Sequence, residues 1–210
     1  MADLQIRIPA TEQELQQAQT AKNEAWAFLN PDRPTSIRPA YEAYRDGFLT
    51  AFVDGKGAGN FILIRLNYDI THPSQKTWDQ LCLNGIVENG DTLYGAGLGV
   101  SPRFSGLGIG SRLVHAALEK TIELNCKQFV LGCRIPDYHK YREIPVEQYI
   151  NLKRADGEFL DRELRFYSRC GLRFLKPLPE YMSGAWADPD CLNYGVLSVW
   201  TNPYYEKGNA

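Results

Sequence analysis

Residues 101–114 read SPRFSGLGIGSRLV, the most informative stretch of the chain. Its three glycines, Gly106, Gly108 and Gly110, alternate with apolar residues and lead into a segment with the spacing of a helix. Glycine is unfavourable at the start of a helix unless the backbone needs a special conformation or a close neighbour there. A strand, a glycine-rich turn and a helix N-terminus together make an anion site, because unpaired N–H groups point out of the first helical turn. The stretch therefore predicts a loop that binds phosphate groups.

The spacing of the glycines narrows the choice of phosphate ligand. The dinucleotide pattern GxGxxG fails, because Ser111 stands where the third glycine would be. The Walker A pattern fails as well, because no Gly-Lys-Ser/Thr follows. The pattern that fits is [Gln/Arg]-x-x-Gly-x-[Gly/Ala], filled by Arg103, Gly106 and Gly108. Arg103 precedes the turn and could add a charge-assisted contact to a phosphate.

With this pattern the chain resembles the GNAT superfamily of acyl-CoA-dependent acyltransferases, in which this loop and helix bind the pyrophosphate of coenzyme A. The strand before the loop ends at Val100 and is followed by Ser101-Pro102, as the family's fourth strand often is. A later segment, FYSRCGL at 166–172, matches the family's aromatic-Tyr-x-x-x-Gly-[Phe/Leu] motif. The resemblance covers residues 1 to about 200, and its specific motifs lie in 93–112 and 161–175.

The order of predicted elements agrees with an α/β GNAT fold, a mixed central sheet of about six to seven strands flanked by about four helices. The polar and aromatic segment 134–160 is predicted to be an insertion before the last major helix, and 1–210 a single acyltransferase domain. Periodicity and turn residues predict strands at 4–8, 49–53, 60–67, 93–100, 128–132, 173–175 and 194–200, and helices at 11–29, 36–48, from the glycine run to 125, at 146–153 and at 161–170.

The overall composition limits the partners and the compartment. The 210 residues are 44% hydrophobic and 23% charged, with a net charge of −2, so no basic field predicts a nucleic acid or an anionic membrane as partner. No apolar run has transmembrane length and no signal peptide is evident, so we expect a cytoplasmic protein. Five cysteines without a CxxC pair and three scattered histidines favour free thiols and no metal site.

The resemblance also implies the residues of the site. Tyr167 would be the general acid that returns a proton to the departing CoA thiolate, since a phenol has a pKa of about 10 and a thiol of about 8.5. Backbone groups of Leu98, Gly99 and Val100 would bind the pantetheine and help to stabilise the oxyanion. The loop residues expected to bind the cofactor are Arg103, Phe104, Ser105, Gly106, Leu107, Gly108, Ile109, Gly110 and Ser111.

The general base is left open by the sequence. Glu88, Asp91, Glu143 and His139 lie near loops that could border the acceptor site, and deprotonation through water, which the family often uses, would need no dedicated base. Cys133 follows a buried strand, but no histidine and acid partner can be identified nearby. A free cysteine in such a place is more often a small buried apolar residue than a nucleophile.

The function implied by the resemblance is transfer of an acyl group, acetyl first, from acyl-CoA to an amine of a small molecule or peptide. Two alternatives stay open: acyl loading onto a carrier-protein thiol or malonyl-CoA decarboxylation, and a non-catalytic acyl-CoA-binding domain. RIPDYHKY at 134–141, with the later Pro-Glu-Tyr and Asn-Tyr-Gly, is similar to GNAT domains fused to nitrilase-type carbon–nitrogen hydrolases. Acceptor specificity is expected from the first two helices and the insertion. The insertion and the aromatic C-terminus could also pack against a second copy in a homodimer.

Overall fold

The central element is a seven-stranded sheet with the strand order β1-β2-β3-β4-β5-β7-β6. The computed structural model describes residues 3–29, 36–73, 77, 80–82, 85–184 and 187–207. Neighbouring strands are antiparallel except β4 and β5, which are parallel, so the mixed sheet of the predicted GNAT fold is confirmed. The strands are β1 (Leu4–Arg7), β2 (Phe48–Val53), β3 (Lys56–Leu66), β4 (Thr92–Val100), β5 (Gln128–Arg134), β6 (Arg173–Leu178) and β7 (Gly195–Thr201).

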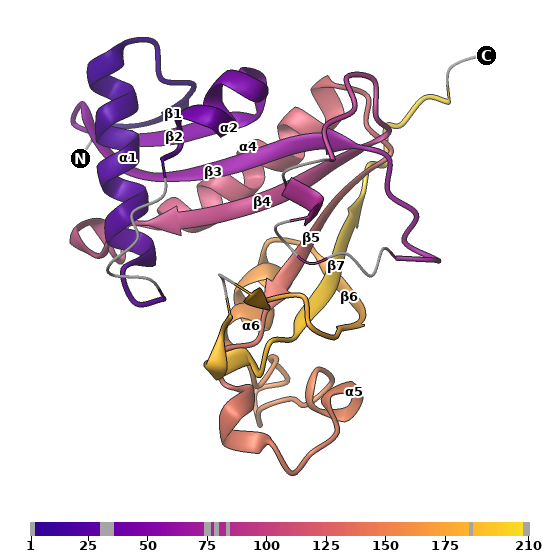
Figure 1. Cartoon of the computed structure of the whole chain (residues 1–210). Coiled ribbons are helices and arrows are strands. Elements are labelled where there is room, and N and C mark those ends of the chain that lie inside the picture. Colours follow the sequence, from indigo (N-terminus) through magenta and orange to yellow (C-terminus); the bar gives the residue numbers. More distant parts are fainter. Residues whose placement is uncertain are drawn as a thin grey trace.

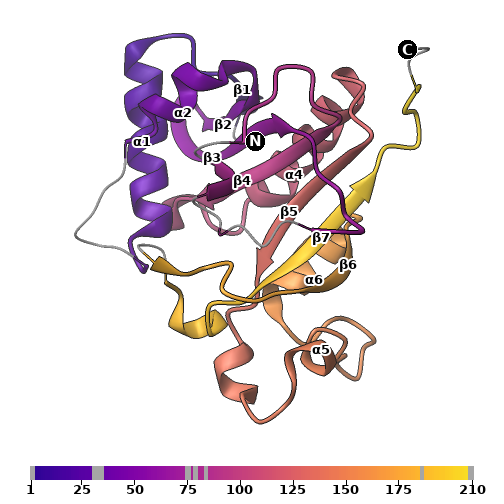
Figure 2. The same ribbon diagram turned by 45° about the vertical axis from the view of Figure 1, so that its right-hand side comes forward.

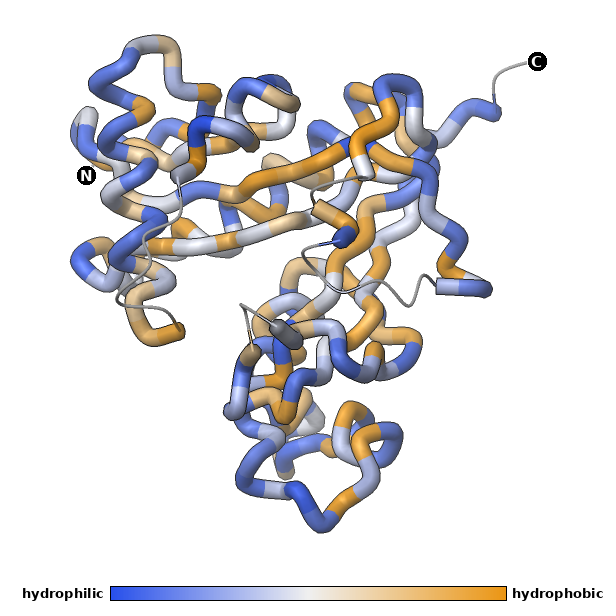
Figure 3. Tube along the Cα trace, in the orientation of Figure 1, coloured by the Kyte–Doolittle hydropathy of each residue, from blue (hydrophilic) through white to orange (hydrophobic). Residues whose placement is uncertain are grey.

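Helices cover both faces of this sheet (Figure 1). The helices are α1 (Glu12–Trp26), α2 (Arg38–Ala43), α4 (Ile109–Glu123), α5 (Val146–Tyr149) and α6 (Arg162–Arg169). Side chains alternate along β2, so Phe48 packs with α1 and α2 while its neighbour Leu49 belongs to the core that contains α4 and α6. Apolar residues follow the central strands, and the outer side of α1 is largely hydrophilic (Figure 3). The two helix pairs therefore lie on opposite faces.

Local signals set several helix ends as predicted. The Thr11 side chain accepts a hydrogen bond from Glu14 N, which confirms the helix start. Asn125, with φ of 47°, follows the end of α4 in the left-handed region. Gly171, with φ of 92°, ends α6 in the same way, as its position predicted.

The predicted helix 36–48 is wrong in its second half. α2 ends at Ala43, a 3₁₀ turn covers 45–47, and Phe48 already begins β2. A Cβ on Gly47 would lie 2.4 Å from the carbonyl oxygen of Leu63, so the chain approaches β3 too closely here for another residue type. The Phe48 ring is fully buried in the strand position. Tertiary burial thus outweighs the local helical pattern.

The insertion forms a small lobe, with α5, below the sheet (Figure 2). Its core is aromatic, with the rings of Tyr138 and Tyr149 4.8 Å apart. The Tyr149 hydroxyl donates a hydrogen bond of 2.9 Å to Asp161, the N-cap residue of α6. Asp161 also accepts hydrogen bonds from Glu163 N and from Asp137 N. The insertion therefore fixes the start of α6.

Asp161→Ala is expected to lower the free energy of unfolding by about 2–4 kcal/mol. The change removes an N-cap, about 1 kcal/mol, and leaves the buried Tyr149 hydroxyl without its acceptor. Urea unfolding measures the loss. Glu147→Ala, on the exposed side of the same lobe, is the control and should stay within about 0.5 kcal/mol of the native protein. Equal effects of the two substitutions would contradict this role of Asp161.

Candidate active site

The two parallel strands at the centre of the sheet separate partway along their length. β4 and β5 pair only from Thr92 with Gln128 to Gly95 with Leu131. Beyond this point β4 stays paired with β3 up to Val100, while β5 stays paired with β7 up to Arg134. Figure 1 shows the two strands diverging. The ends of β4 and β5 therefore form the two sides of an opening in the sheet.

On the β5 side of the opening, an aromatic side chain packs closely against the sheet. The ring of Tyr181 lies against β5 and β7, where a Cβ on Gly132 would be 2.2 Å from Cζ of Tyr181 and one on Gly195 would be 2.5 Å from Cδ1. On the other side, the register between β3 and β4 shifts between Ile62 and Leu63, a bulge that bends β4. In an antiparallel pair, alternate residues turn their N–H and C=O groups away from the partner strand. Part of the β4 backbone therefore faces the opening.

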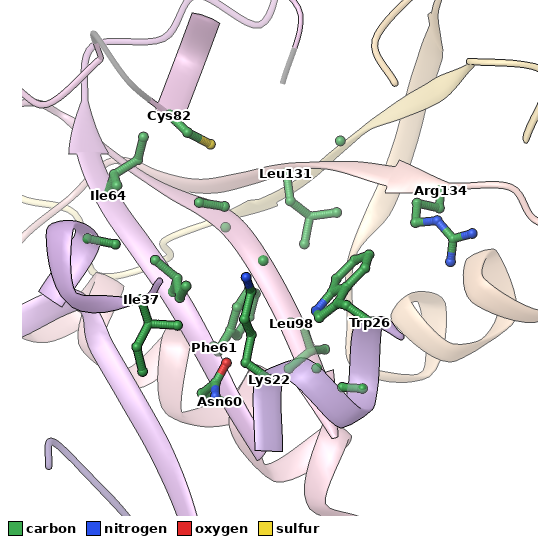
Figure 4. A pocket seen from close by; sticks show the side chains of 18 of the residues that line it. Lys22, Trp26, Ile37, Asn60, Phe61, Ile64, Cys82, Leu98, Leu131 and Arg134 are labelled. Atoms are coloured by element: carbon green, nitrogen blue, oxygen red, sulfur yellow. The ribbon is translucent and has the colours of Figure 1, made fainter. Parts of the chain in front are cut away.

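A cavity of about 920 Å³ occupies this opening (Figure 4). Leu98, Gly99 and Val100, the three backbone positions predicted from the sequence, all line it. A Cβ on Gly99 would lie 2.8 Å from Nε1 of Trp26, so the glycine lets α1 approach β4 closely. The lining includes residues of α1, α2, β3, β4, α4, β5 and α6, which brings together segments far apart in the sequence.

The glycine loop has the geometry of an anion-binding helix start. Gly106 and Gly108 have φ of 78° and 69°, values that favour glycine, and a Cβ on either would meet no atom within 4 Å. Gly108 is the N-cap of α4 and no side chain caps this helix. The N–H groups of Ile109, Gly110 and Ser111, in the first turn, therefore have no intrahelical acceptor and point out of the helix. The macrodipole adds partial positive charge at the same place.

Two other predicted loop residues, Gly110 and Arg103, contact neighbouring helices, unlike Gly106 and Gly108. Gly110 lines the cavity, and a Cβ there would lie 3.3 Å from Cζ of Phe166, so this glycine allows α4 and α6 to pack closely. The guanidinium of Arg103 forms an ion pair with Glu24 of α1, with Nη2 to Oε1 at 2.9 Å. Ser101 also donates a hydrogen bond to Glu24. Arg103 thus connects the loop to α1.

Tyr167, the predicted general acid, lies on α6 and lines the cavity. Its side chain is 8% exposed and packs edge to face on Phe166, with ring centroids 4.8 Å apart. Within the described part of the chain its hydroxyl has no hydrogen-bond partner. Burial raises the pKa of Tyr167 well above its ordinary value of 10. The phenol therefore stays protonated at neutral pH and can donate a hydrogen bond into the cavity.

Beside Tyr167 lies a cluster of three charged side chains that the sequence did not predict. Arg134, at the end of β5, donates from Nη1 to Oε1 of Glu163 at 2.9 Å and from Nε to Oδ2 of Asp188 at 2.6 Å. Arg134 and Glu163 line the cavity, whereas Asp188 is fully buried. One signal was present in the sequence: Glu163 precedes Tyr167 by four residues, which places both on one face of a helix.

The other candidates from the sequence lie away from the cavity. None of Glu88, Asp91, Glu143 and His139 lines it. The His139 ring nitrogen lies 3.0 Å from the carbonyl oxygen of Pro136, inside the insertion. Cys133 is buried, and burial raises the pKa of its thiol well above the ordinary value, which agrees with the structural interpretation.

Two negative findings apply to the described residues. Residues 3–29, 36–73, 77, 80–82, 85–184 and 187–207 contain no group of three or more histidine, cysteine, aspartate and glutamate side chains placed to hold a metal ion. In the same parts of the chain, no helix has both the length and the apolar character needed to cross a membrane.

Comparison with known proteins identifies the family. Residues 12–142 match the acetyltransferase (GNAT) family, and the chain belongs to this family. It is 32% identical over 174 residues to the Bacillus subtilis "Uncharacterized N-acetyltransferase YkwB", covering 80% of this chain and 74% of that one. It is also 25% identical over 189 residues to the B. subtilis "Probable hydrolase YhcX", covering 88% of this chain but only 36% of that protein.

Solved structures share the fold. The loading GNATL domain of CurA from Lyngbya majuscula has a TM-score of 0.82 at 21% identity, covering 95% of this chain and 98% of that one. The GNAT-like decarboxylase GphF, in complex with isobutyryl-CoA, has a TM-score of 0.76 at 18% identity, covering 94% and 98%. The ribosomal-protein-S18-alanine N-acetyltransferase of Escherichia coli has a TM-score of 0.56 at 11% identity, covering 99% and 97%.

Gly108→Ala is expected to weaken CoA binding by at least about tenfold, as measured by calorimetry. A β-carbon in the left-handed region costs about 1–2 kcal/mol, and relief of this strain would turn the N–H groups of the first α4 turn. Gly55→Ala is a matched control, because Gly55 has φ of 75° with no atom near its Cβ position and lies in the turn between β2 and β3. Both variants should lose similar stability, and only Gly108→Ala should lose CoA affinity. Unchanged affinity in Gly108→Ala would exclude this loop as the phosphate site.

Proposed function

We propose that this protein transfers an acyl group, acetyl in the simplest case, from acyl-CoA to an amine acceptor. The observation that carries the proposal is the cavity between β4 and β5, which brings Tyr167 close to a strand edge with free backbone groups and opens beside the uncapped start of α4. The family assignment and the N-acetyltransferase relative support it. An acyl-CoA would place its pyrophosphate at Ile109–Ser111 and its pantetheine along β4.

The transfer is a direct attack on the thioester. The amine nitrogen bonds to the carbonyl carbon, the carbon–sulfur bond breaks, and the amine loses one proton. Backbone N–H groups of 98–100 that face the opening would stabilise the oxyanion. The hydroxyl of Tyr167 would donate its proton to the CoA thiolate as it leaves, and solvent would return a proton to the phenol. The burial that raises the pKa of Tyr167 would also make the thiolate more basic, which favours this transfer.

The first experiment is turnover of acetyl-CoA with a panel of amines, amino acids and peptides, followed by release of the free thiol. Tyr167→Phe is expected to lower kcat by about 100-fold or more, the range of general acid–base catalysis, with unchanged affinity for acetyl-CoA. Tyr204→Phe, at a side chain that is 70% exposed, is the control and should keep full turnover. Full turnover by Tyr167→Phe would remove this residue from the mechanism.

A second candidate function is acyl loading onto a carrier-protein thiol or decarboxylation of malonyl-CoA. It is supported by the higher TM-scores, 0.82 and 0.76, with a loading domain and a decarboxylase than with the E. coli N-acetyltransferase, 0.56. Malonyl-CoA in the absence of any amine tests for the decarboxylase, which releases carbon dioxide and acetyl-CoA. CoA release that requires a carrier protein and does not occur with a free amine tests for the loading activity. A non-catalytic acyl-CoA-binding domain would bind acetyl-CoA and show turnover in none of these assays.

A further inference from the structure

The cluster of Arg134, Glu163 and Asp188 has an uneven charge balance. Two carboxylates share one guanidinium, so the cluster carries a net charge of −1 when all three groups are ionised. Asp188 is held in place by the backbone N–H groups of Asp190 and Cys191 and by the Cys191 thiol, all of which donate to it. The positive charge of Arg134 interacts with Asp188 as well as with Glu163. The guanidinium therefore compensates the negative charge of Glu163 only in part.

Glu163 is the carboxylate of the cluster that lines the cavity and is partly exposed. Its Oε1 accepts the hydrogen bond from Arg134, and among the described residues its Oε2 has no hydrogen-bond partner. The side chain is 28% exposed and lines the cavity together with Tyr167, one helical turn further along α6. Arg134 is in turn oriented by Asp188 and packs over the ring of Phe28, 4.9 Å from its centroid. The carboxylate thus has a fixed position beside the reacting groups.

We propose that Glu163 is the general base of the acyl transfer and that Arg134 and Asp188 are its positioning residues. As the amine nitrogen attacks the thioester carbon, its proton moves to Oε2 of Glu163, while the proton for the thiolate comes from Tyr167. The carboxylic acid then loses its proton to solvent. This proposal rests on the proposed amine acyltransfer.

The electrostatic surroundings of Glu163 fit this role. Burial is the largest effect and raises its pKa from 4.5 to about 7, against the opposing effect of Arg134. A base with a pKa near the working pH is efficient, because it is ionised in a large fraction of molecules and still accepts protons readily. The charged and titratable groups near Glu163 also belong to other elements, and Lys22 lines the same cavity from α1. They are Arg134, Asp161, Arg162, Tyr167, Asp188 and the thiols of Cys133 and Cys191.

The test is the pH dependence of kcat/KM with acetyl-CoA and aniline, an amine that stays uncharged from about pH 5.5 to pH 9. In the native protein the rate should rise about tenfold per pH unit and level off near pH 7, since the carboxylate is the active form. Glu163→Gln should lower kcat by about 100-fold, abolish this rise and leave the KM for acetyl-CoA unchanged. Glu147→Gln, on the insertion, is the control and should keep the native profile. Arg134→Lys should lower kcat, because lysine cannot keep both hydrogen bonds of the guanidinium, and should move the rise to higher pH, a shift that a purely structural role would not produce.

A direct titration of the Glu163 carboxyl group tests its ionisation without any acceptor amine. The infrared difference between native protein and Glu163→Gln should show a carboxyl group that titrates near pH 7. Titration at the ordinary value, or a Glu163→Gln variant with the native rate profile, overturns the proposal for Glu163 alone. If the native protein acylates no amine in the panel, aniline included, the proposed function fails together with it. Glutamine keeps the oxygen that accepts from Arg134, so the variant is expected to fold.

The far end of the same cavity has a different chemistry. Apolar residues from α2, β3 and positions 82, 86 and 182 contribute to the lining of the cavity, namely Ile37, Ala40, Ile62, Ile64, Cys82, Ile86 and Met182. Figure 4 shows Ile37, Ile64 and Cys82 on the side of the cavity away from Arg134. This end lies on the α1 and α2 face of the sheet, whereas the glycine loop and Tyr167 lie on the α4 and α6 face.

The geometry points to an acceptor amine that carries an extended hydrocarbon group. CoA would occupy the α4 and α6 face, so the acceptor reaches the thioester from the opposite face, through the apolar end. This inference also rests on the proposed amine acyltransfer. Burial of each methylene group there should raise kcat/KM by about fourfold.

Two substrate series distinguish the acceptor from the acyl chain as the occupant. With acetyl-CoA, kcat/KM should rise with the length of a linear alkylamine, and with a fixed short amine it should not rise with the length of the acyl chain. Ala40→Leu should reduce the gain for long amines and leave short amines unaffected, while Glu42→Leu, on the exposed side of α2, should change neither. A rise with acyl length only, or no rise in either series, would overturn the inference.

Discussion

The separation of β4 from β5 beyond Gly95 is the constraint on which the site depends. Neighbouring strands inside a sheet normally pair along their length, since buried N–H and C=O groups without partners are costly. Here both strands keep their outer partners and lose each other, while Tyr181 packs closely against two glycines of β5 and β7. A ligand with its own amide groups can pair with the open edge of β4. The substrate can thus occupy the place in the sheet that a neighbouring strand would otherwise fill.

Charge and burial give different parts of the opening different chemical roles. The uncapped start of α4 offers N–H groups and partial positive charge without a side-chain competitor. Tyr167 and Glu163 lie one turn apart on α6, and burial raises the pKa of both, so one remains a proton donor and the other becomes a base near neutral pH. The insertion stabilises this arrangement from outside, through the hydrogen bond of Tyr149 to the α6 cap.

Residues with a local signal could be predicted from the sequence. The positive φ angles of Gly106 and Gly108 agree with the glycine pattern, and Tyr167, whose place in the site was implied by the family motif FYSRCGL, lines the cavity. The insertion, predicted at 134–160, was expected to contribute to specificity, and among its described residues Arg134, which the structure places at the end of β5, lines the cavity. The charged cluster was missed because Arg134 is 29 residues from Glu163 and 54 from Asp188, and only tertiary packing joins them. The end of α2 was missed for the same reason, because the close approach of Gly47 to β3 decides it.

A crystal structure of the protein with bound CoA would show directly whether the opening between β4 and β5 is the acyl-CoA site. We expect the pyrophosphate oxygens to accept hydrogen bonds from the N–H groups of Ile109, Gly110 and Ser111, and the pantetheine to lie between β4 and β5. The sulfur should then lie within hydrogen-bond distance of the Tyr167 hydroxyl, with Oε2 of Glu163 facing the space for the acceptor. CoA bound outside the opening, or with its sulfur directed away from Tyr167, would contradict the account.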